Sequence, residues 1–361
     1  MRVLVVKTSS LGDVVHALPA VTDAARALSG IRFDWVVEEA FAEVPAWHPA
    51  VEEVIPVAIR RWRHQPGRAL LEAPVFLRRL RKRRYDRVID AQGLLKSAAV
   101  TLLARGVRCG LEARSAREPF AASAYRRRVA VARDQHAVTR VRQLFAAALG
   151  YAMPAGEADY GLSRPRPSAA PPERPYFVLL HGTTWASKRW PEANWRALAR
   201  MAGEGGYDVF LPWHDAGQKE EAARIAEGCE RAHLSRTGSL QDLAALVCGA
   251  CAFVAGDTGP AHIAAAFGVP GVVIYGATHP ALTGTTGPGQ IHLTADFSCS
   301  PCRSRVCRYR GPSELWPACY ATVPPGRVWE SLRALMDGSR STTHATTAAQ
   351  AASGSPDRGG D

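Results

Sequence analysis

Short apolar runs alternate with amphipathic stretches over the first half of the chain. Four of these runs are continuous and rich in β-branched residues, which predicts strands buried on both faces. The predicted strands are Val3–Val6, Phe33–Val37, Val54–Val57 and Arg87–Asp90. Leu70–Arg84 and Leu94–Ala104 have helical spacing instead. This alternation predicts a parallel sheet covered by helices.

The same alternation starts again in the second half. Phe177–Leu180 and Val209–Pro212 predict strands, and Asn194–Ala202 and Gln218–Glu227 predict helices. The pattern continues through Leu240–Cys248, Ala252–Ala255, Ala261–Phe267 and Val272–Tyr275. We therefore expect an α/β protein with two doubly wound domains, whose ligands bind at the carboxyl ends of the strands, in the cleft between the domains.

Composition marks the domain boundaries. Residues 161–175 contain five prolines, which predicts a stiff linker between a domain at 1–160 and a second domain at 176–335. The tail at 339–361 has almost no large apolar side chains. Such a segment cannot bury enough surface to offset its ordering entropy, so we expect it to be disordered.

All of the excess positive charge lies in the first 150 residues. They hold 26 Lys and Arg against 14 Asp and Glu, which accounts for the whole net charge of +12. This asymmetry predicts an anionic partner, such as nucleic acid, an acidic membrane surface or a phosphorylated acceptor. A solvated helix face explains the run from Arg78 to Arg84 equally well. Aromatic residues are sparse at 60–87 and no known motif occurs there, so we expect no nucleic acid partner.

Signals for export or membrane insertion are lacking in this sequence. Only four apolar residues separate Arg2 from Lys7, too few for a signal peptide. No run reaches the roughly 18 apolar residues that a membrane span needs. The hydrophobic content of 47% is ample for two buried cores. We expect a cytoplasmic protein.

Four of the eight cysteines cluster near the carboxyl end, at Cys299, Cys302, Cys307 and Cys319. In a chain expected to be cytosolic, clustered cysteines suggest a metal before they suggest disulfides. The spacing lacks the paired C-x2-C form that zinc sites often have. We therefore expect a cysteine-rich loop without metal, and a structural zinc site remains the alternative.

The first candidate site is the loop from Lys7 to Asp13, which follows the first predicted strand. Gly12 allows a tight turn there. Asp13 is a candidate general base that takes a proton from an acceptor hydroxyl. On spacing alone, Asp13 is at least as well explained as a cap of the next helix. Pro19 predicts a kink or a late helix start.

Two further loops follow strands of the second domain. In His181–Pro191, the hydroxyls of Thr183 and Thr184 and the charge of Lys188 suit a phosphate, although a solvated turn explains the pattern too. The stretch from Asp257 to His262 predicts a helix start, which binds phosphate through free amides and the helix dipole.

Within that stretch each residue has a candidate role. The amides of Thr258 and Gly259 point at the ligand, Asp257 orients a sugar hydroxyl, and His262 contacts a phosphate. A helical His is, however, more often simply packed in the core.

Together the three loops indicate group transfer from a nucleotide diphosphate sugar. A diphosphate leaving group needs its charge neutralised more than it needs a proton. One carboxylate then suffices as base, in contrast to the pair used in glycoside hydrolysis. No D-x-D metal clamp occurs in the sequence, so we expect transfer without a metal and without a cofactor.

Several sequence blocks resemble glycosyltransferase family 9, specifically the lipopolysaccharide heptosyltransferases of the type that adds the first heptose. The resemblance covers about residues 1–335. The blocks are 1–19, 33–39, 57–63, 90–97, 116–119 and 257–262.

The resemblance implies a GT-B fold with two facing Rossmann-like domains. It also implies an inverting transfer of L-glycero-D-manno-heptose from ADP-heptose to the inner Kdo of Kdo2-lipid A, at the cytoplasmic face of the inner membrane. The protein would then be peripheral to that membrane. Transfer of the second heptose, or of another nucleotide sugar, is the alternative.

Residue roles carry over where motifs match. Asp13 matches the catalytic base. The matching donor positions are Thr183, Thr184, Lys188, Asp257, Thr258, Gly259 and His262, and Gln218 replaces a Glu near the ribose. Gln accepts a hydrogen bond without charge. The basic positions expected to meet the anionic acceptor are Arg60, Arg61, Arg63, Lys96 and Arg117.

Overall fold

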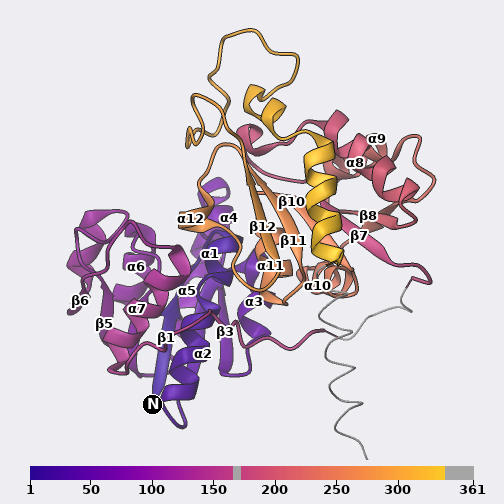
Figure 1. Cartoon of the computed structure of the whole chain (residues 1–361). Helices are drawn as coiled ribbons and strands as arrows, with labels where there is room; N and C mark the ends of the chain where they lie inside the picture. The colour runs from indigo at the N-terminus through magenta and orange to yellow at the C-terminus, as the bar shows by residue number, and fades with distance from the viewer. Residues whose placement is uncertain (166–171, 338–361) are drawn as a thin grey trace, which may run out of the picture.

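The computed structural model describes residues 1–165 and 172–337, and it consists of two α/β lobes side by side (Figure 1). Each lobe contains a six-stranded sheet whose strands all pair in parallel. This confirms the predicted fold class. Residues 166–171 of the expected linker and the expected tail at 339–361 lie outside the described residues.

The first sheet has the strand order β3-β2-β1-β4-β5-β6. Its strands are β1 (Arg2–Val6), β2 (Arg32–Glu38), β3 (Val51–Val57), β4 (Tyr85–Asp90), β5 (Gly106–Leu111) and β6 (Arg127–Val129). Val3 pairs with Phe33 on one side and with Arg87 on the other, so β1 is central. The order reverses direction between β1 and β4, which is where ligands bind in doubly wound sheets.

The second sheet repeats that order, reading β12-β11-β10-β7-β8-β9. Its strands are β7 (Tyr176–Leu180), β8 (Asp208–Trp213), β9 (Ala232–Arg236), β10 (Ala252–Gly256), β11 (Gly271–Tyr275) and β12 (Gln290–Thr294). Here the reversal lies between β7 and β10, the two strands that precede the second and third candidate loops.

Helices cover both sheets. Those of the first lobe are α1 (Leu11–Val15), α2 (Leu18–Ala27), α3 (Glu43–Ala46), α4 (Ile59–His64), α5 (Pro66–Arg81), α6 (Leu95–Leu103) and α7 (Ala137–Leu149). Those of the second are α8 (Glu192–Glu204), α9 (Ala216–Ala226), α10 (Leu240–Cys248), α11 (Gly259–Ala266) and α12 (Pro280–Thr283), followed by a helix at 325–337. Short 3-10 turns are η1 (Glu39–Phe41), η2 (Pro119–Ala124), η3 (Ala186–Lys188) and η4 (Ala318–Thr322).

The predicted break near Pro19 is confirmed, because α1 ends at Val15 and α2 starts at Leu18 with Pro19 in its first turn. The helix expected at 70–84 starts earlier and ends at Arg81, since Tyr85 already belongs to β4. Among the described residues, no helix is both long and apolar enough to span a bilayer.

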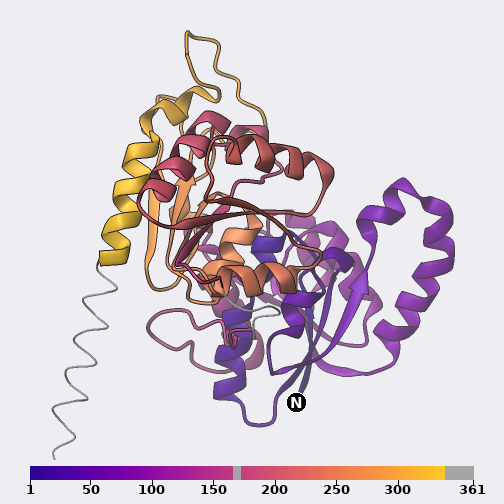
Figure 2. The same cartoon turned by 90° about the vertical axis from the view of Figure 1, so that its right-hand side faces the viewer.

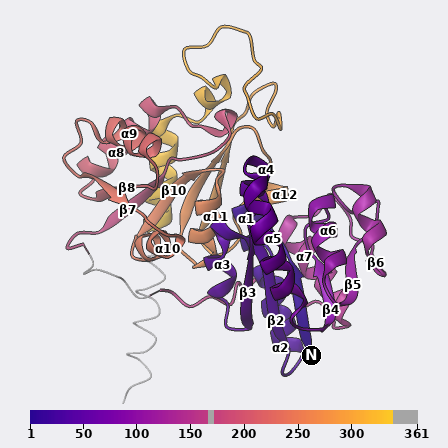
Figure 3. The same cartoon turned by 180° about the vertical axis from the view of Figure 1, so that it is seen from behind.

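The two lobes meet through α1 and α11, which lie next to each other (Figure 3). Both helices have a glycine at the contact: a Cβ on Gly12 would stand 2.7 Å from His262, and one on Gly259 would stand 2.8 Å from Leu11. Nearby, the rings of Trp47 and Phe267 pack with their centres 5.4 Å apart. The buried apolar core therefore runs continuously from one lobe into the other.

Candidate functional site

In each lobe, the loops at the reversal of strand order are tied together. After β1 and β4, the ammonium of Lys7 donates to the carbonyl of Ala91 at 2.9 Å, and the amide of Thr8 donates to Oε1 of Gln92 at 2.7 Å. After β7 and β10, the hydroxyl of Thr258 donates to the carbonyl of Gly182 at 3.0 Å. Each lobe thus holds its own candidate loops together, and the contact between α1 and α11 brings the two sets next to each other.

Asp13 lies in the first turn of α1, with Ser10 as the N-cap. Its Oδ2 accepts from the amide of Ser10 at 2.9 Å and from the Ser10 hydroxyl at 2.7 Å. Its Oδ1 lies 3.9 Å from the ammonium of Lys7. The side chain is 39% exposed. One carboxylate oxygen therefore serves the helix terminus, and the other remains available to a substrate, so the two interpretations from sequence are compatible.

The charge state of Asp13 follows from these contacts. Burial alone would raise its pKa, but the charge of Lys7 and the two hydrogen bonds from Ser10 outweigh burial and lower the pKa to about 2. The carboxylate is consequently ionised at neutral pH and able to accept a proton.

Three histidines from both lobes gather beside Asp13. Nε2 of His16 lies 3.1 Å from Nδ1 of His262, and the ring of His136 lies 5.6 Å from that of His16. Nε2 of His136 also lies 3.1 Å from the carbonyl oxygen of Gly284 in the second lobe. Burial lowers the pKa of His16 well below its usual value and that of His262 to about 4. Both rings are thus neutral, and one donates to the other across the lobe contact.

Lys188 stands at the end of η3 and faces the start of α11. Its ammonium lies 2.5 Å from Oδ2 of Asp257 and 4.5 Å from the centre of the Trp185 ring. The hydroxyl of Thr278 donates to the same Asp257 oxygen. Lys188 and Asp257 are only 16% and 8% exposed. Asp257 therefore holds Lys188 at the mouth of the helix, with two of the three ammonium hydrogens left for a ligand.

The amino end of α11 is suited to an anion. Thr258 is the N-cap and Gly259 and Pro260 form the first turn. Pro260 has no N–H, so the amides of Thr258 and Gly259 are the ones that can meet a phosphate. The Thr258 hydroxyl is engaged with the second candidate loop, which fixes that loop against the helix end.

The remaining donor candidates surround this point. Thr183 and Thr184 lie on the loop between β7 and η3, half-buried and exposed respectively. Gln218 sits in the first turn of α9, where its amide donates to Asp215, and its side chain packs beside Gly182. The structure brings all of these residues to the carboxyl edge of the second sheet.

The basic candidates of the first lobe differ in exposure and in the contacts that their side chains make. Arg60 and Arg63 are exposed on α4, and Arg117 is exposed beside the loop after β4. Lys96 donates to the hydroxyl of Ser9 at 2.7 Å, within reach of the Asp13 loop. Arg61 is engaged by two carboxylates, those of Glu39 and Glu72. Arg61 thus differs from the other basic candidates, because its guanidinium already pairs with carboxylates of the first lobe.

Sequence reasoning missed His16 and His136. His16 could have been found, because it follows Asp13 by three positions and such residues share a helix face. No signal marks His136, since its contacts with His16 and Gly284 depend on long-range folding.

Comparison with known proteins adds an independent observation. Residues 75–312 match the family model described as glycosyltransferase family 9 (heptosyltransferase). The chain is 51% identical, over 93% of its length and 98% of the relative's, to lipopolysaccharide heptosyltransferase 1 of Pseudomonas aeruginosa. The chain belongs to glycosyltransferase family 9.

Two further relatives of this family 9 enzyme are informative, one with a solved structure and one with a more distant sequence. The structure of the Escherichia coli heptosyltransferase WaaC with ADP-2-deoxy-2-fluoro heptose matches with a TM-score of 0.79 and 40% identity, over 92% of this chain and 99% of that chain. Lipopolysaccharide heptosyltransferase 2 of Escherichia coli is 27% identical over 93% of this chain and 99% of that one. The sequence of this glycosyltransferase is thus more similar to heptosyltransferase 1 than to heptosyltransferase 2.

Proposed function

We propose that this glycosyltransferase moves L-glycero-D-manno-heptose from ADP-heptose to the inner Kdo of Kdo2-lipid A, with inversion at the anomeric carbon. The observation that carries the proposal is the direct packing of α1, which bears Asp13, against α11, whose amino end suits a diphosphate. The 51% identity to a heptosyltransferase 1 supports the choice of sugar and of the first transfer.

The proposed transfer needs one base and one anion site. Oδ1 of Asp13 takes the proton from the acceptor hydroxyl as that oxygen attacks the anomeric carbon. The bond from that carbon to the β-phosphate oxygen breaks, and its electron pair leaves with ADP. Lys188 and the dipole of α11 stabilise the added negative charge.

The low pKa of Asp13 keeps it ionised but makes the free carboxylate a weak base. An acceptor that covers this side chain, now 39% exposed, would add to its burial. Burial disfavours the charged form and raises the pKa towards the range where proton transfer is effective. Acceptor binding would therefore activate the base.

The acceptor is expected on the first lobe, near Arg60, Arg63, Lys96 and Arg117, where cations can meet its carboxylates and phosphates.

We further propose that the protein rests on the cytoplasmic face of the inner membrane. On α5, Leu70 and Leu71 are 80% and 77% exposed among several arginines. Such a face suits a bilayer with anionic lipids. Sedimentation with anionic vesicles, and its loss with neutral ones, would test this.

The assay for the function combines purified protein, ADP-heptose and Kdo2-lipid A, with the product identified by mass spectrometry. We expect one heptose to be added. Absence of any heptosylated product would contradict the proposal. Transfer only to an acceptor that already carries a heptose would favour the second-heptose alternative, and preferential stabilisation by UDP over ADP would favour another nucleotide sugar.

A further inference from the structure

A long irregular loop joins β12 to η4 and rises from the second lobe away from the first (Figure 2). Between Ala295 and Pro317 the chain, all of it described, forms no helix or strand. Irregular loops of this length are uncommon inside compact domains unless something else holds them. Cys299, Cys302 and Cys307 lie within this loop.

The fourth thiol of the group stands at the base of the loop. Cys319 is half-buried in η4, next to the fully buried Tyr320. Cys319 is thus held in the packed part of the second lobe, whereas the other three thiols lie on the irregular loop.

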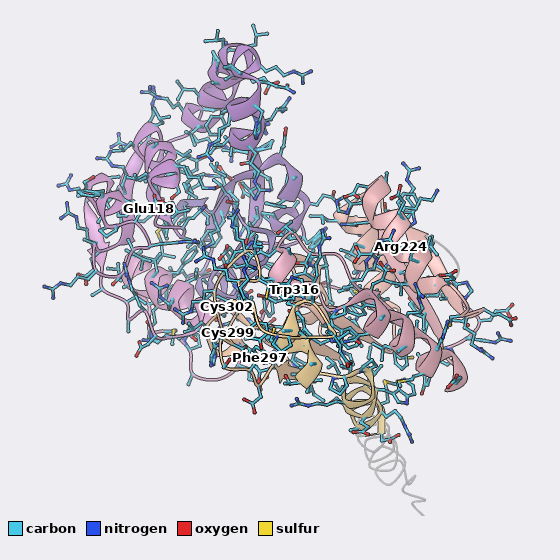
Figure 4. The ribbon with its side chains drawn as sticks, turned by 90° about the horizontal axis from the view of Figure 1, so that it is seen from above. Glu118, Arg224, Phe297, Cys299, Cys302 and Trp316 are labelled. Atoms are coloured by element: carbon cyan, nitrogen blue, oxygen red, sulfur yellow. The ribbon has the colours of Figure 1, made fainter. Side chains whose placement is uncertain are left out.

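All four thiols line the same cavity, whose volume is about 390 Å³. Figure 4 shows Cys299 and Cys302 near each other, and Phe297 lines the same cavity. All four cysteines are free. Within the described residues, no three His, Cys, Asp or Glu side chains already stand close enough to share a metal ion. A metal would therefore have to draw the loop inward onto the fixed Cys319.

The charge of the loop fits such an ion. Four thiolates around Zn²⁺ carry a net charge of about −2. The stretch from 297 to 317 contains the arginines Arg303, Arg305, Arg308 and Arg310 against one acid, Glu314. Arg308 and Arg310 also line the cavity. These cations would balance the charge of a tetrathiolate site.

We propose that Cys299, Cys302, Cys307 and Cys319 form a structural site for Zn²⁺, bound through four thiolates. Four sulfur ligands in tetrahedral geometry are typical of structural zinc, with sulfurs about 2.3 Å from the ion. The loop forms no helix or strand, so closing it around the ion would break no ladder of backbone hydrogen bonds.

The zinc site would also affect the loop at 181–191, which carries Lys188. The role of that loop in holding the donor rests on the proposed function. The Ser187 amide, next to Lys188, donates to the carbonyl of Arg305 at 3.2 Å, and the Ser187 hydroxyl donates to the carbonyl of Ser304. The guanidinium of Arg305 also lies 5.5 Å from the centre of the Trp185 ring. These contacts tie the cysteine loop to the segment that presents Lys188, so an ion that moves the loop would also change how Lys188 is held.

The test measures metal in the full-length protein, purified under reducing conditions without added metal or chelator. Elemental analysis should find about one zinc per chain, and the Cys302→Ser and Cys319→Ser variants should lose it. Cys251→Ser is the matched control, because Cys251 lies outside the loop and should leave the zinc content unchanged. Replacement by Co²⁺ should give the absorption bands of tetrahedral thiolate coordination.

Protein that holds no metal and takes up no Co²⁺ after reduction would overturn the proposal, as would zinc that persists in both serine variants. Two disulfides in place of four metal-bound thiols would also overturn it. None of these readouts depends on activity, so failure of the zinc site and failure of the proposed function are distinguishable. If both hold, zinc removal should raise the KM for the ADP-sugar.

Discussion

Replacing Gly12 by Ala places a methyl group inside the contact between the lobes. The new Cβ would stand 2.7 Å from Cδ2 of His262 and 3.1 Å from its Nε2. His262 is 5% exposed and hydrogen-bonded to His16, so its ring has little room to move. Overpacking of this kind costs about 1–3 kcal/mol.

A smaller effect has the opposite sign. Alanine is favoured over glycine inside a helix by about 0.5–1 kcal/mol, and Gly12 lies in α1. The clash should outweigh that gain, leaving a net loss of about 1–2 kcal/mol. Because each kcal/mol shifts the Tm of a domain of this size by about 2–4 °C, we expect a Tm lower by several degrees.

Thermal unfolding of four variants tests this reasoning. Gly67→Ala is the control, since a Cβ there meets nothing within 4 Å and should leave the Tm unchanged or slightly higher. In a His262→Ala background the clash is absent, so Gly12→Ala should no longer destabilise the protein. An equal loss in both backgrounds would refute the packing of α1 on α11.

Three further predictions concern the site. Lys188→Ala should weaken ADP binding by about 10- to 100-fold, measured by calorimetry, because a charged hydrogen bond contributes about 1.5–3 kcal/mol. Burial lowers the pKa of His262 to about 4. Between pH 6.5 and about 4, His262 is protonated in the unfolded chain but neutral in the folded one. Lowering the pH over this range should therefore reduce the free energy of unfolding by up to about 3 kcal/mol. Urea unfolding should show the loss at acid pH, and His262→Gln should reduce it. Arg63→Ala should raise the KM for the acceptor, whereas Arg61→Ala should chiefly lower the Tm, since it leaves Glu39 and Glu72 without their shared partner.

The inner strands other than β5 could be predicted, because most of them are buried on both faces and read as apolar runs. Phe253 and Val273, for example, are fully buried in β10 and β11. Of the edge strands, β3 was predicted from Val54–Val57, whereas β6, β9 and β12 were not. All positions of β9 (Ala232–Arg236) are partly or fully exposed, and β6 consists of two arginines and a valine. An edge strand has a partner on one side only, so its sequence need not be apolar.

Part of the candidate site could likewise be predicted from the sequence, and part of it could not. Asp13, Lys188 and Thr258 follow strand ends, so local sequence places them at the carboxyl edge of their sheets. The pairing of Lys188 with Asp257, and of His16 with His262, joins segments far apart in the chain. Local periodicity carries no information about such pairs, because tertiary packing alone decides them.

The most direct measurement is heptose transfer by the Asp13→Asn variant, compared with its affinity for ADP. Asparagine keeps the shape and can still accept from Ser10, but it cannot take the acceptor's proton. We predict that turnover falls by about 10²- to 10⁴-fold while ADP binds as tightly as before. Turnover close to that of the unmodified enzyme would contradict the assignment of Asp13 as the base.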